Sequence, residues 1–258
     1  MRALACLVFI ALAYAVRGNP DLYKGPMGSK DAPIGKFPYQ VILRYDISEP
    51  GPYECGGSIL NNRNILTSAS CFDMLDKDKL KAHVGTNFFT VPGDIYDVAN
   101  VTIHKNYTKD IGDNDIALIH LETPIKYNKL VQPINFMTSD KDLFGNPGTL
   151  TGWGSTGVFD VVVNPLQEVE LIVYRPNACG ECWDQEDWTT TQFCALTREE
   201  GTALYYNYGS PLVANGNQIG ILKRNIQPVL SARTYEPRLK IFTRVSYFVE
   251  WIINHLKN

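Results

Sequence analysis

The sequence contains few of the short motifs that identify nucleotide or zinc sites. It has no GxxxxGK[ST], no HExxH and no pair of CxxC motifs. These absences argue against a phosphate-binding loop and against the commonest zinc sites. Basic residues do not dominate, since 24 Lys and Arg stand against 27 Asp and Glu for a net charge of −3. This balance argues against a nucleic-acid partner. We therefore expect neither a cofactor nor a metal.

Beyond the N-terminus the sequence also lacks any apolar run long enough for a membrane span. The N-terminal run itself follows Arg2, extends from Ala3 to Ala13 and ends in the small-x-small pattern that Ala15 completes. This pattern is typical of a secretory signal peptide, although an uncleaved anchor is an alternative. We expect a signal peptide over residues 1–15, cleaved after Ala15 or alternatively after Gly18. A short extension over 16–25, a secreted chain and no membrane partner complete this expectation.

Cysteine is scarce and odd in number once the signal peptide is removed. Cys6 belongs to that segment, and five of the six cysteines remain: Cys55, Cys71, Cys179, Cys182 and Cys194. In an oxidising compartment cysteines usually pair, and an odd number leaves one over. Spacing alone does not assign the partners.

What the sequence does contain is a series of short apolar runs separated by turn residues, followed by a helical pattern. Apolar residues at helical spacing, Val245, Phe248, Val249, Ile252 and Leu256, predict a C-terminal helix that Thr243 or Ser246 would cap. In the run 167–173, Val169, Leu171 and Val173 alternate with Glu168, Glu170 and Ile172, which predicts one buried face. Many short strands with one late helix predict an all-β barrel or sandwich. The expected strands are 39–45, 64–68, 115–121, 167–173 and 217–222.

Several blocks resemble the trypsin- and chymotrypsin-like serine proteases, particularly those of arthropods. They occur in family order: DAPIGKFPYQV at 31–41, CGGSIL at 55–60, NDIALI at 114–119, TGWGS at 151–155, PLV at 211–213 and FTRVS at 242–246. The resemblance covers about 26–258, taken as one domain. It implies two six-stranded antiparallel β-barrels with an active site between them, and a C-terminal α-helix.

The same resemblance implies a degenerate catalytic triad. The family's histidine block reads LTSASC here, which places Ser70 at the histidine, whereas the aspartate is present as Asp115. The family's serine block reads YNYGSPLV, which places Tyr208 at the nucleophile. A shifted alignment would make Ser210 the nucleophile, but would still supply no base. None of the four histidines, His83, His104, His120 and His255, lies in a nucleophile-like context.

This sequence also departs from the family's pattern at positions outside the triad. Tyr206 stands at a glycine of the oxyanion loop, and Asn207 stands at the aspartate that binds the new N-terminus after activation. The family's Ser-Trp-Gly stretch, which pairs with substrate, corresponds to Lys223, Arg224 and Asn225. A serine hydroxyl does not accept a proton near neutral pH as imidazole does. The resemblance therefore implies a protein that has lost peptidase activity.

The resemblance also implies disulfide pairs, and the sequence adds two possible modification sites. The implied pairs are Cys55–Cys71 and Cys179–Cys194, which leaves Cys182 free or paired between chains; otherwise we expect a monomer. Asn100 and Asn106 begin sequons that glycosylation would modify in a secreted chain, unless they stay unused. Six basic residues between 223 and 244 favour a polyanion as a candidate ligand, unless their charges are scattered: Lys223, Arg224, Arg233, Arg238, Lys240 and Arg244.

The expected function is binding rather than catalysis. The resemblance implies a regulator or decoy with a protein partner, such as a component of a protease cascade or a host target. Immunity in the haemolymph, venom, saliva or gut is the implied setting. The alternative is an active serine-type endopeptidase with atypical residues.

Overall fold

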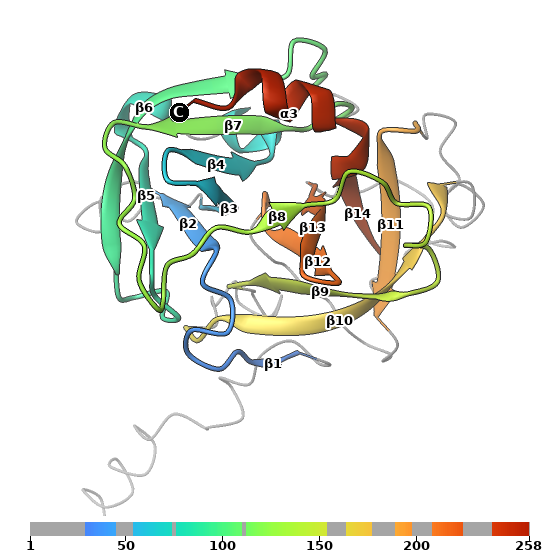
Figure 1. The fold of residues 1–258 in the computed structure, drawn as a ribbon, viewed down its shortest axis with the longest axis horizontal. Helices are drawn as coiled ribbons and strands as arrows, with labels where there is room; N and C mark the ends of the chain where they lie inside the picture. The colour runs from blue at the N-terminus through green and yellow to red at the C-terminus, as the bar shows by residue number, and fades with distance from the viewer. Residues whose placement is uncertain are drawn as a thin grey trace, which may run out of the picture.

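The computed structural model describes residues 29–44, 54–73, 76–109, 112–153, 164–176, 189–197, 208–223 and 239–257. The expected signal peptide and the extension after it lie outside these residues. Figure 1 shows the two barrels side by side, with the C-terminal helix against the first barrel. None of the helices in the described residues is long and apolar enough to cross a membrane.

The first barrel is a closed sheet whose strands follow the order β2-β3-β4-β7-β6-β5. All of its neighbouring strands pair antiparallel. Apolar side chains fill its centre, including Val41, Leu43 and Ile119, because successive residues of a strand point to opposite faces. Its strands are β2 (Gln40–Arg44), β3 (Cys55–Asn61), β4 (Asn64–Thr67), β5 (Lys81–Val84), β6 (Asp94–Ile103) and β7 (Ala117–Leu121).

The second barrel closes in the order β10-β11-β14-β13-β12-β9, because β9 pairs with both β12 and β10. Two short strands extend this sheet, one antiparallel along β10 and one parallel along β13: β1 (Lys30–Asp31) and β8 (Asn135–Phe136). The six barrel strands are β9 (Pro147–Gly152), β10 (Gln167–Tyr174), β11 (Gln192–Thr197), β12 (Pro211–Ala214), β13 (Asn217–Leu222) and β14 (Leu239–Arg244). The fold is therefore the one that the resemblance implies.

The C-terminal segment forms two consecutive helical turns of different type. A 3₁₀ turn, η4 (Val245–Tyr247), precedes the α-helix α3 (Val249–His255). The expected apolar stripe packs against Leu66, Leu118 and Ile221, so its role in packing is confirmed. The expected caps are wrong, because the Thr243 hydroxyl donates to the Asp115 carbonyl and the Ser246 hydroxyl donates to Asp140.

One face of β10 differs from the expected alternation. Val169, Leu171 and Val173 are buried as expected, but Glu168 on the other face is buried too. Its carboxylate accepts a hydrogen bond of 2.5 Å from Lys36 and lies 3.5 Å from the ammonium of Lys30. β1 lies next to this part of β10 in the sheet, where Lys30 pairs with Glu168. Two lysines thus compensate the charge of this buried carboxylate.

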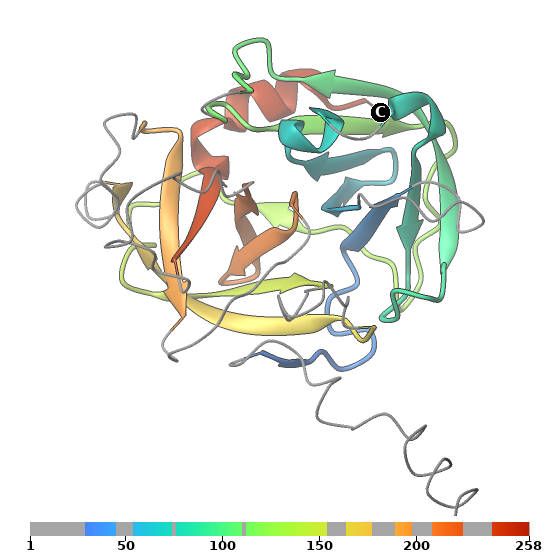
Figure 2. The same cartoon turned by 180° about the vertical axis from the view of Figure 1, so that it is seen from behind.

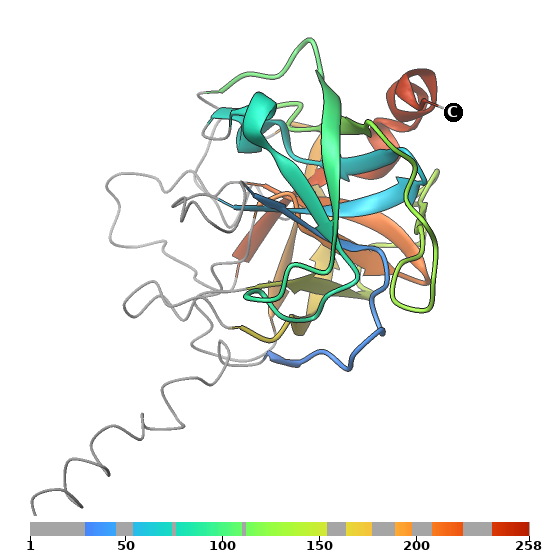
Figure 3. The same ribbon diagram turned by 90° about the vertical axis from the view of Figure 1, so that its left-hand side faces the viewer.

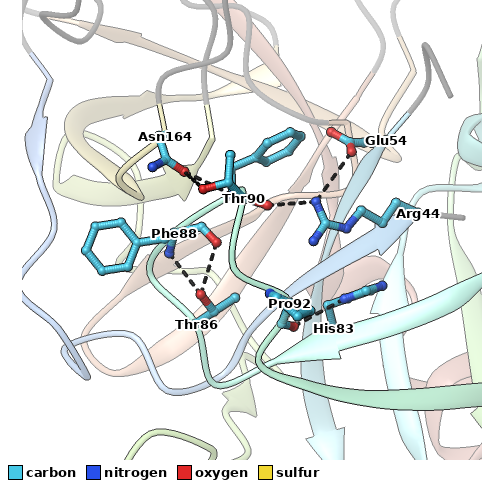
Figure 4. Close-up of polar contacts among 9 residues, drawn as sticks. Arg44, Glu54, His83, Thr86, Phe88, Thr90, Pro92 and Asn164 are labelled. Carbon is cyan, nitrogen blue, oxygen red and sulfur yellow. Dashed lines mark hydrogen bonds and ion pairs between the residues drawn. The ribbon is translucent and has the colours of Figure 1, made fainter. Parts of the chain in front are cut away.

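The β5–β6 loop connects the two barrels through side-chain and backbone contacts (Figure 4). The Thr90 backbone N–H and hydroxyl both donate to Oδ1 of Asn164 at 3.0 Å. On the other side of the loop, Nη1 of Arg44 donates to the Phe89 carbonyl at 2.7 Å and lies 3.8 Å from Glu54. Burial raises the pKa of Glu54 to about 7, and the Arg44 charge opposes this shift.

Figures 2 and 3 show the short 3₁₀ turns of the first barrel from the opposite side and from the edge. One of them, η2 (Ala69–Asp73), follows β4 and carries Ser70; the second, η3 (Lys77–Lys79), precedes β5. Asp76 caps η3 with its side chain, an ordinary N-cap. The position of η2 matters for function, because it brings Ser70 to the start of β7.

Candidate functional site

The structure brings Ser70 and Asp115 into direct contact where the first barrel meets the second. Asp115 precedes β7 and is 1% exposed. The Ser70 backbone N–H donates to Oδ1 of Asp115 at 2.7 Å, and the Ser70 hydroxyl donates to Oδ2 at 2.9 Å. The Asp115 carbonyl accepts a hydrogen bond of 2.8 Å from Thr243 of β14. Both oxygens of this carboxylate are therefore occupied, and its main chain is fixed by the second barrel.

Burial dominates the electrostatics of this carboxylate. It raises the pKa of Asp115 to about 6, although the hydrogen bonds from Ser70 and the charge of Lys223 lower it. Lys223 is also buried, which lowers its pKa to about 8 against the opposing effect of Asp115 and Asp113. Two opposite charges thus stabilise each other inside the protein. Neither is an imidazole, and the Ser70 hydroxyl is not a base near neutral pH.

Lys223, which the resemblance places in the family's substrate-pairing stretch, is buried. Its side chain is 4% exposed, and its ammonium donates to Oε1 of Gln192 at 2.7 Å. Gln192 donates in turn to the hydroxyl of Thr189, and that hydroxyl donates to Asp113 at 2.8 Å. Thr191 also donates to Asp113. This network joins the segment before β7 to β11, and sequence reasoning missed it, because its members come from three separate segments.

Tyr208 lies beside β3 of the first barrel. Its carbonyl accepts a hydrogen bond of 2.7 Å from the Gly56 backbone N–H. Its partly buried side chain packs against the apolar core of the first barrel, which includes the disulfide between Cys55 and Cys71. The residue that the resemblance places at the nucleophile therefore adds a large side chain to the packing between the barrels.

The two residues after Tyr208 approach the first barrel closely. Gly209 has a φ of +84°, and a Cβ on it would lie 2.2 Å from the Thr67 hydroxyl oxygen. Gly56 faces Ser210, so that a Cβ on Gly56 would lie 2.2 Å from the Ser210 hydroxyl oxygen. That hydroxyl is fully buried and has no hydrogen-bond partner in the described structure. Glycine is required at both positions, and Ser210 is packed against backbone.

The four histidines are engaged elsewhere. Nδ1 of His120 is 2.8 Å from Oδ1 of Asn64, and its Nε2 is 2.8 Å from the Thr102 hydroxyl. Burial lowers the pKa of His120 to about 4. The other three contact neither Ser70 nor Ser210 in the contacts described: His83 lies by Pro92 (Figure 4), His104 against Phe248 and Trp251, and His255 by Trp251.

Some of the other expected site residues are described by the structure, and others lie outside the described residues. Cys55 and Cys71 form a disulfide, the pair that the resemblance implies. Cys194 is also disulfide-bonded, but its expected partner lies outside the described residues. Asn100 and Asn106, the first residues of the two sequons, are both exposed. Besides Cys179, expected positions outside the described residues include Tyr206, Asn207, Arg224, Asn225 and Cys182.

The expected basic concentration does not form an exposed patch in the residues that can be described. Lys223 and Lys240 are buried, and Arg244 forms a two-pronged contact with Asp140. The remaining three members, Arg224, Arg233 and Arg238, lie outside the described residues. Within the described ranges, no three His, Cys, Asp or Glu side chains gather closely enough to hold a metal ion.

Comparison with known proteins agrees with this architecture. The sequence model of the trypsin family matches residues 26–252. The chain belongs to the trypsin-like S1 serine protease family. It is 34% identical to chymotrypsin-2 of Vespa crabro over 88% of this chain and 97% of that one. It is 27% identical to a trypsin of Phaedon cochleariae over 95% of this chain and 93% of the relative.

One similar solved structure is that of an inactivated protease paralogue. The crystal structure of the scabies mite inactivated protease paralogue S-D1 superimposes with a TM-score of 0.76 at 27% identity, over 88% of this chain and 95% of that chain. The likeness supports the chymotrypsin-like fold of two barrels and one C-terminal helix. Relatives named as proteases and a neighbour named as an inactivated paralogue therefore both occur among similar chains.

Proposed function

We propose that this chain is a secreted trypsin-family protein that has lost peptidase activity and acts by binding another protein. The observation that carries the proposal is the contact of Ser70 with both oxygens of Asp115. In a working triad the aspartate orients a histidine that takes the nucleophile's proton. Here Ser70 occupies the carboxylate instead, and none of the four histidines contacts Ser70 or Asp115 in the contacts described.

The surroundings of the two candidate nucleophiles, Tyr208 and Ser210, support the same proposal. Tyr208 is a phenol packed against the first barrel, and phenols ionise only near pH 10. Ser210, the alternative nucleophile, is fully buried against Gly56. A substrate carbonyl cannot reach a hydroxyl in that position. Serine-type catalysis with atypical residues is therefore the weaker alternative.

The buried pair of Lys223 and Asp115 argues that the altered site is a stable arrangement. A carboxylate that is buried without a cation nearby is strongly unfavourable. Lys223 supplies a cation whose charge lowers the pKa of Asp115. The substitutions at these positions are therefore mutually consistent, as expected of a chain that keeps its fold while its chemistry changes.

The proposed role is that of a regulator or decoy outside the cell, in venom, saliva, the gut or haemolymph. A disulfide in the first barrel and membership of a family that is typically secreted support this compartment. The likeness to an inactivated mite paralogue supports the loss of activity. We further propose that Asn100 and Asn106, both exposed, carry glycans, and that Cys179 pairs with Cys194.

The proposal is tested by measuring hydrolysis of denatured casein and of a mixed peptide library. We expect the wild-type chain and the Ser70→His/Tyr208→Ser double variant both to stay at background. The double variant completes the three side chains of the triad, but a triad works only when its oxyanion donors and its groove are also held within about 0.5 Å. Hydrolysis by the wild type that Asp115→Asn abolishes would refute the proposal.

A further inference from the structure

Three loops that are far apart in the sequence meet at one end of the first barrel. They are residues 32–38 before β2, 85–93 between β5 and β6, and 126–132 after β7. Gly35 packs so closely on Leu130 that a Cβ there would lie 3.0 Å from Cδ2, and Gly85 is placed in the same way 2.9 Å from Val131. Asn87 donates to the Ala32 carbonyl at 2.9 Å. Figures 1 and 2 show these loops gathered at one lower corner; we call them the three-loop face.

The three-loop face concentrates exposed apolar side chains. Ten large apolar or aromatic side chains are exposed in the described part of the chain, and five of these ten belong to the three loops. The ring of Phe88 turns away from the Arg44–Glu54 pair (Figure 4). Apolar side chains gathered in this way mark an interaction site more often than scattered ones do. The five, between 39% and 69% exposed, are Ile34, Phe88, Val91, Tyr127 and Leu130.

Lysines are the charged residues of the three loops themselves, while the exposed Asp31 and Asp94 border them. The loops contain Lys36, Lys126 and Lys129 but no Asp or Glu, although the whole chain carries a net charge of −3. Lys36 is paired with Glu168. Lys126 and Lys129 are exposed and form no ion pair with the residues that the structure describes. These two lysines flank Tyr127 and precede Leu130, so free positive charge lies beside the apolar side chains.

We propose that the three-loop face docks on an anionic phospholipid surface. Apolar and aromatic side chains enter the headgroup boundary of a bilayer, and neighbouring lysines bind lipid phosphates. Ile34 and Leu130 would enter this boundary, while Lys126 and Lys129 contact the headgroups. A soluble polyanion would satisfy the lysines but leave the apolar side chains in water. A lipid surface satisfies both.

The backbone of the three-loop face is already fixed, which favours such docking. The loops hydrogen-bond to the barrel and to each other, as Gln132 does with Pro38 at 3.0 Å. Docking therefore costs little backbone entropy. The sequence offered no sign of this face, because its residues are spread over about a hundred positions. The inference is independent of the proposed function, since an active peptidase with the same loops would dock in the same way.

The test is sedimentation of the full chain with vesicles of phosphatidylcholine, alone or with about one-third phosphatidylserine, at low and at physiological salt. We expect binding to the anionic vesicles that weakens with salt. Ile34→Ser/Leu130→Ser and Lys126→Glu/Lys129→Glu should each weaken it at least about tenfold. The matched controls are Ile253→Ser on α3, an exposed apolar residue away from the face, and Lys105→Glu. Both should bind as the wild type does.

Four outcomes would overturn the inference. They are absence of wild-type binding, equal binding to vesicles with and without phosphatidylserine, equal loss in the control variants, and binding that the serine substitutions leave unchanged. Retention on heparin resin without vesicle binding would assign the face to a soluble polyanion instead. Circular dichroism of each variant separates a loss of binding from a loss of fold.

Discussion

The hydroxyl and the backbone N–H of Ser70 both donate to the carboxylate of Asp115, at 2.9 and 2.7 Å. The carboxylate is therefore satisfied by a neutral side chain, while its charge is balanced by Lys223. In a protease, by contrast, this carboxylate must keep its charge to hold a histidine. The difference makes Asp115 the residue whose substitution distinguishes a structural site from a catalytic one.

Asp115→Asn should make the protein more stable at neutral pH. The folded-state pKa of about 6 lies above the ordinary value of 3.8, so the folded state binds more protons than the unfolded state between these values. The contribution of Asp115 to stability therefore falls as pH rises through this window, by up to about 3 kcal/mol. An asparagine can accept from the Ser70 N–H and donate to its hydroxyl, which has Ser68 as a further acceptor. Urea denaturation at pH 4 and pH 7.5 measures the difference.

Asp140→Asn is the matched control, because the pKa of Asp140 is shifted in the opposite direction from that of Asp115. Hydrogen bonds from Arg244 and Ser246, together with the Arg244 charge, outweigh burial and hold the pKa of Asp140 below its usual value. The stability that Asp140 contributes is present at neutral pH and is lost as pH falls. Asp140→Asn should therefore destabilise the protein more at pH 7.5 than at acid pH. If both variants changed stability in the same direction at neutral pH, our account of these carboxylates would be wrong.

Lys223→Met should destabilise the protein, and Asp115→Asn should reverse part of the loss. Without Lys223 the buried charge of Asp115 loses its cation, so removing that charge becomes more favourable. We expect a coupling free energy of about 1–2 kcal/mol in a double-mutant cycle at neutral pH. Lys240 is the control, since it is equally buried and its lowered pKa has no contribution from Asp115. Equal coupling of Lys240→Met to Asp115→Asn would show that the effect is not specific.

Ser210→Ala should stabilise the protein by about 1 kcal/mol, because it removes a buried hydroxyl that has no partner. Ser58→Ala is the matched control. The Ser58 hydroxyl is equally buried, but it donates to Gln218 at 2.6 Å, and its loss should cost about 1 kcal/mol. Thermal and urea denaturation of both variants would decide the question. A destabilised Ser210→Ala would imply a hydrogen bond that our description of this site omits.

His120 should stay neutral to an unusually low pH. Its Nδ1–H donates to Asn64, because the amide nitrogen of Asn64 already donates to Asn61 and Lys257. Its Nε2 then accepts from Thr102, a bond that protonation would break. The folded pKa of about 4 lies below the ordinary 6.5, so stability is lost as pH falls through that range. NMR titration of the ring should give a midpoint below 5; a midpoint near 6.5 would contradict this network.

Sequence patterns predicted the strands well where local residues determine the structure. The run 217–222 is β13 with the expected bounds, because the turn at Asn215 and Gly216, both at positive φ, precedes it. β7 begins at Ala117 instead of Asp115, because the Asp115 carbonyl bonds to Thr243 of the other barrel. Such a contact between distant segments leaves no local signal.

Only part of the candidate site was predicted, because several of its contacts also join distant segments. The family resemblance selected Ser70 and Asp115, and the structure places them in contact. It did not predict that Lys223 would be buried and turned to Gln192, since burial depends on segments that pack around it. The three-loop face was missed entirely, because its apolar residues show no periodicity within any one loop.

The most direct test of the account is the intact mass of the protein after incubation with a fluorophosphonate, which labels an activated serine. With Ser70 bound to Asp115 and Ser210 buried against Gly56, we predict no added mass under conditions that fully label a trypsin. Stoichiometric labelling of one serine in the folded chain, lost in Asp115→Asn, would show that the chain is a peptidase and would contradict the account.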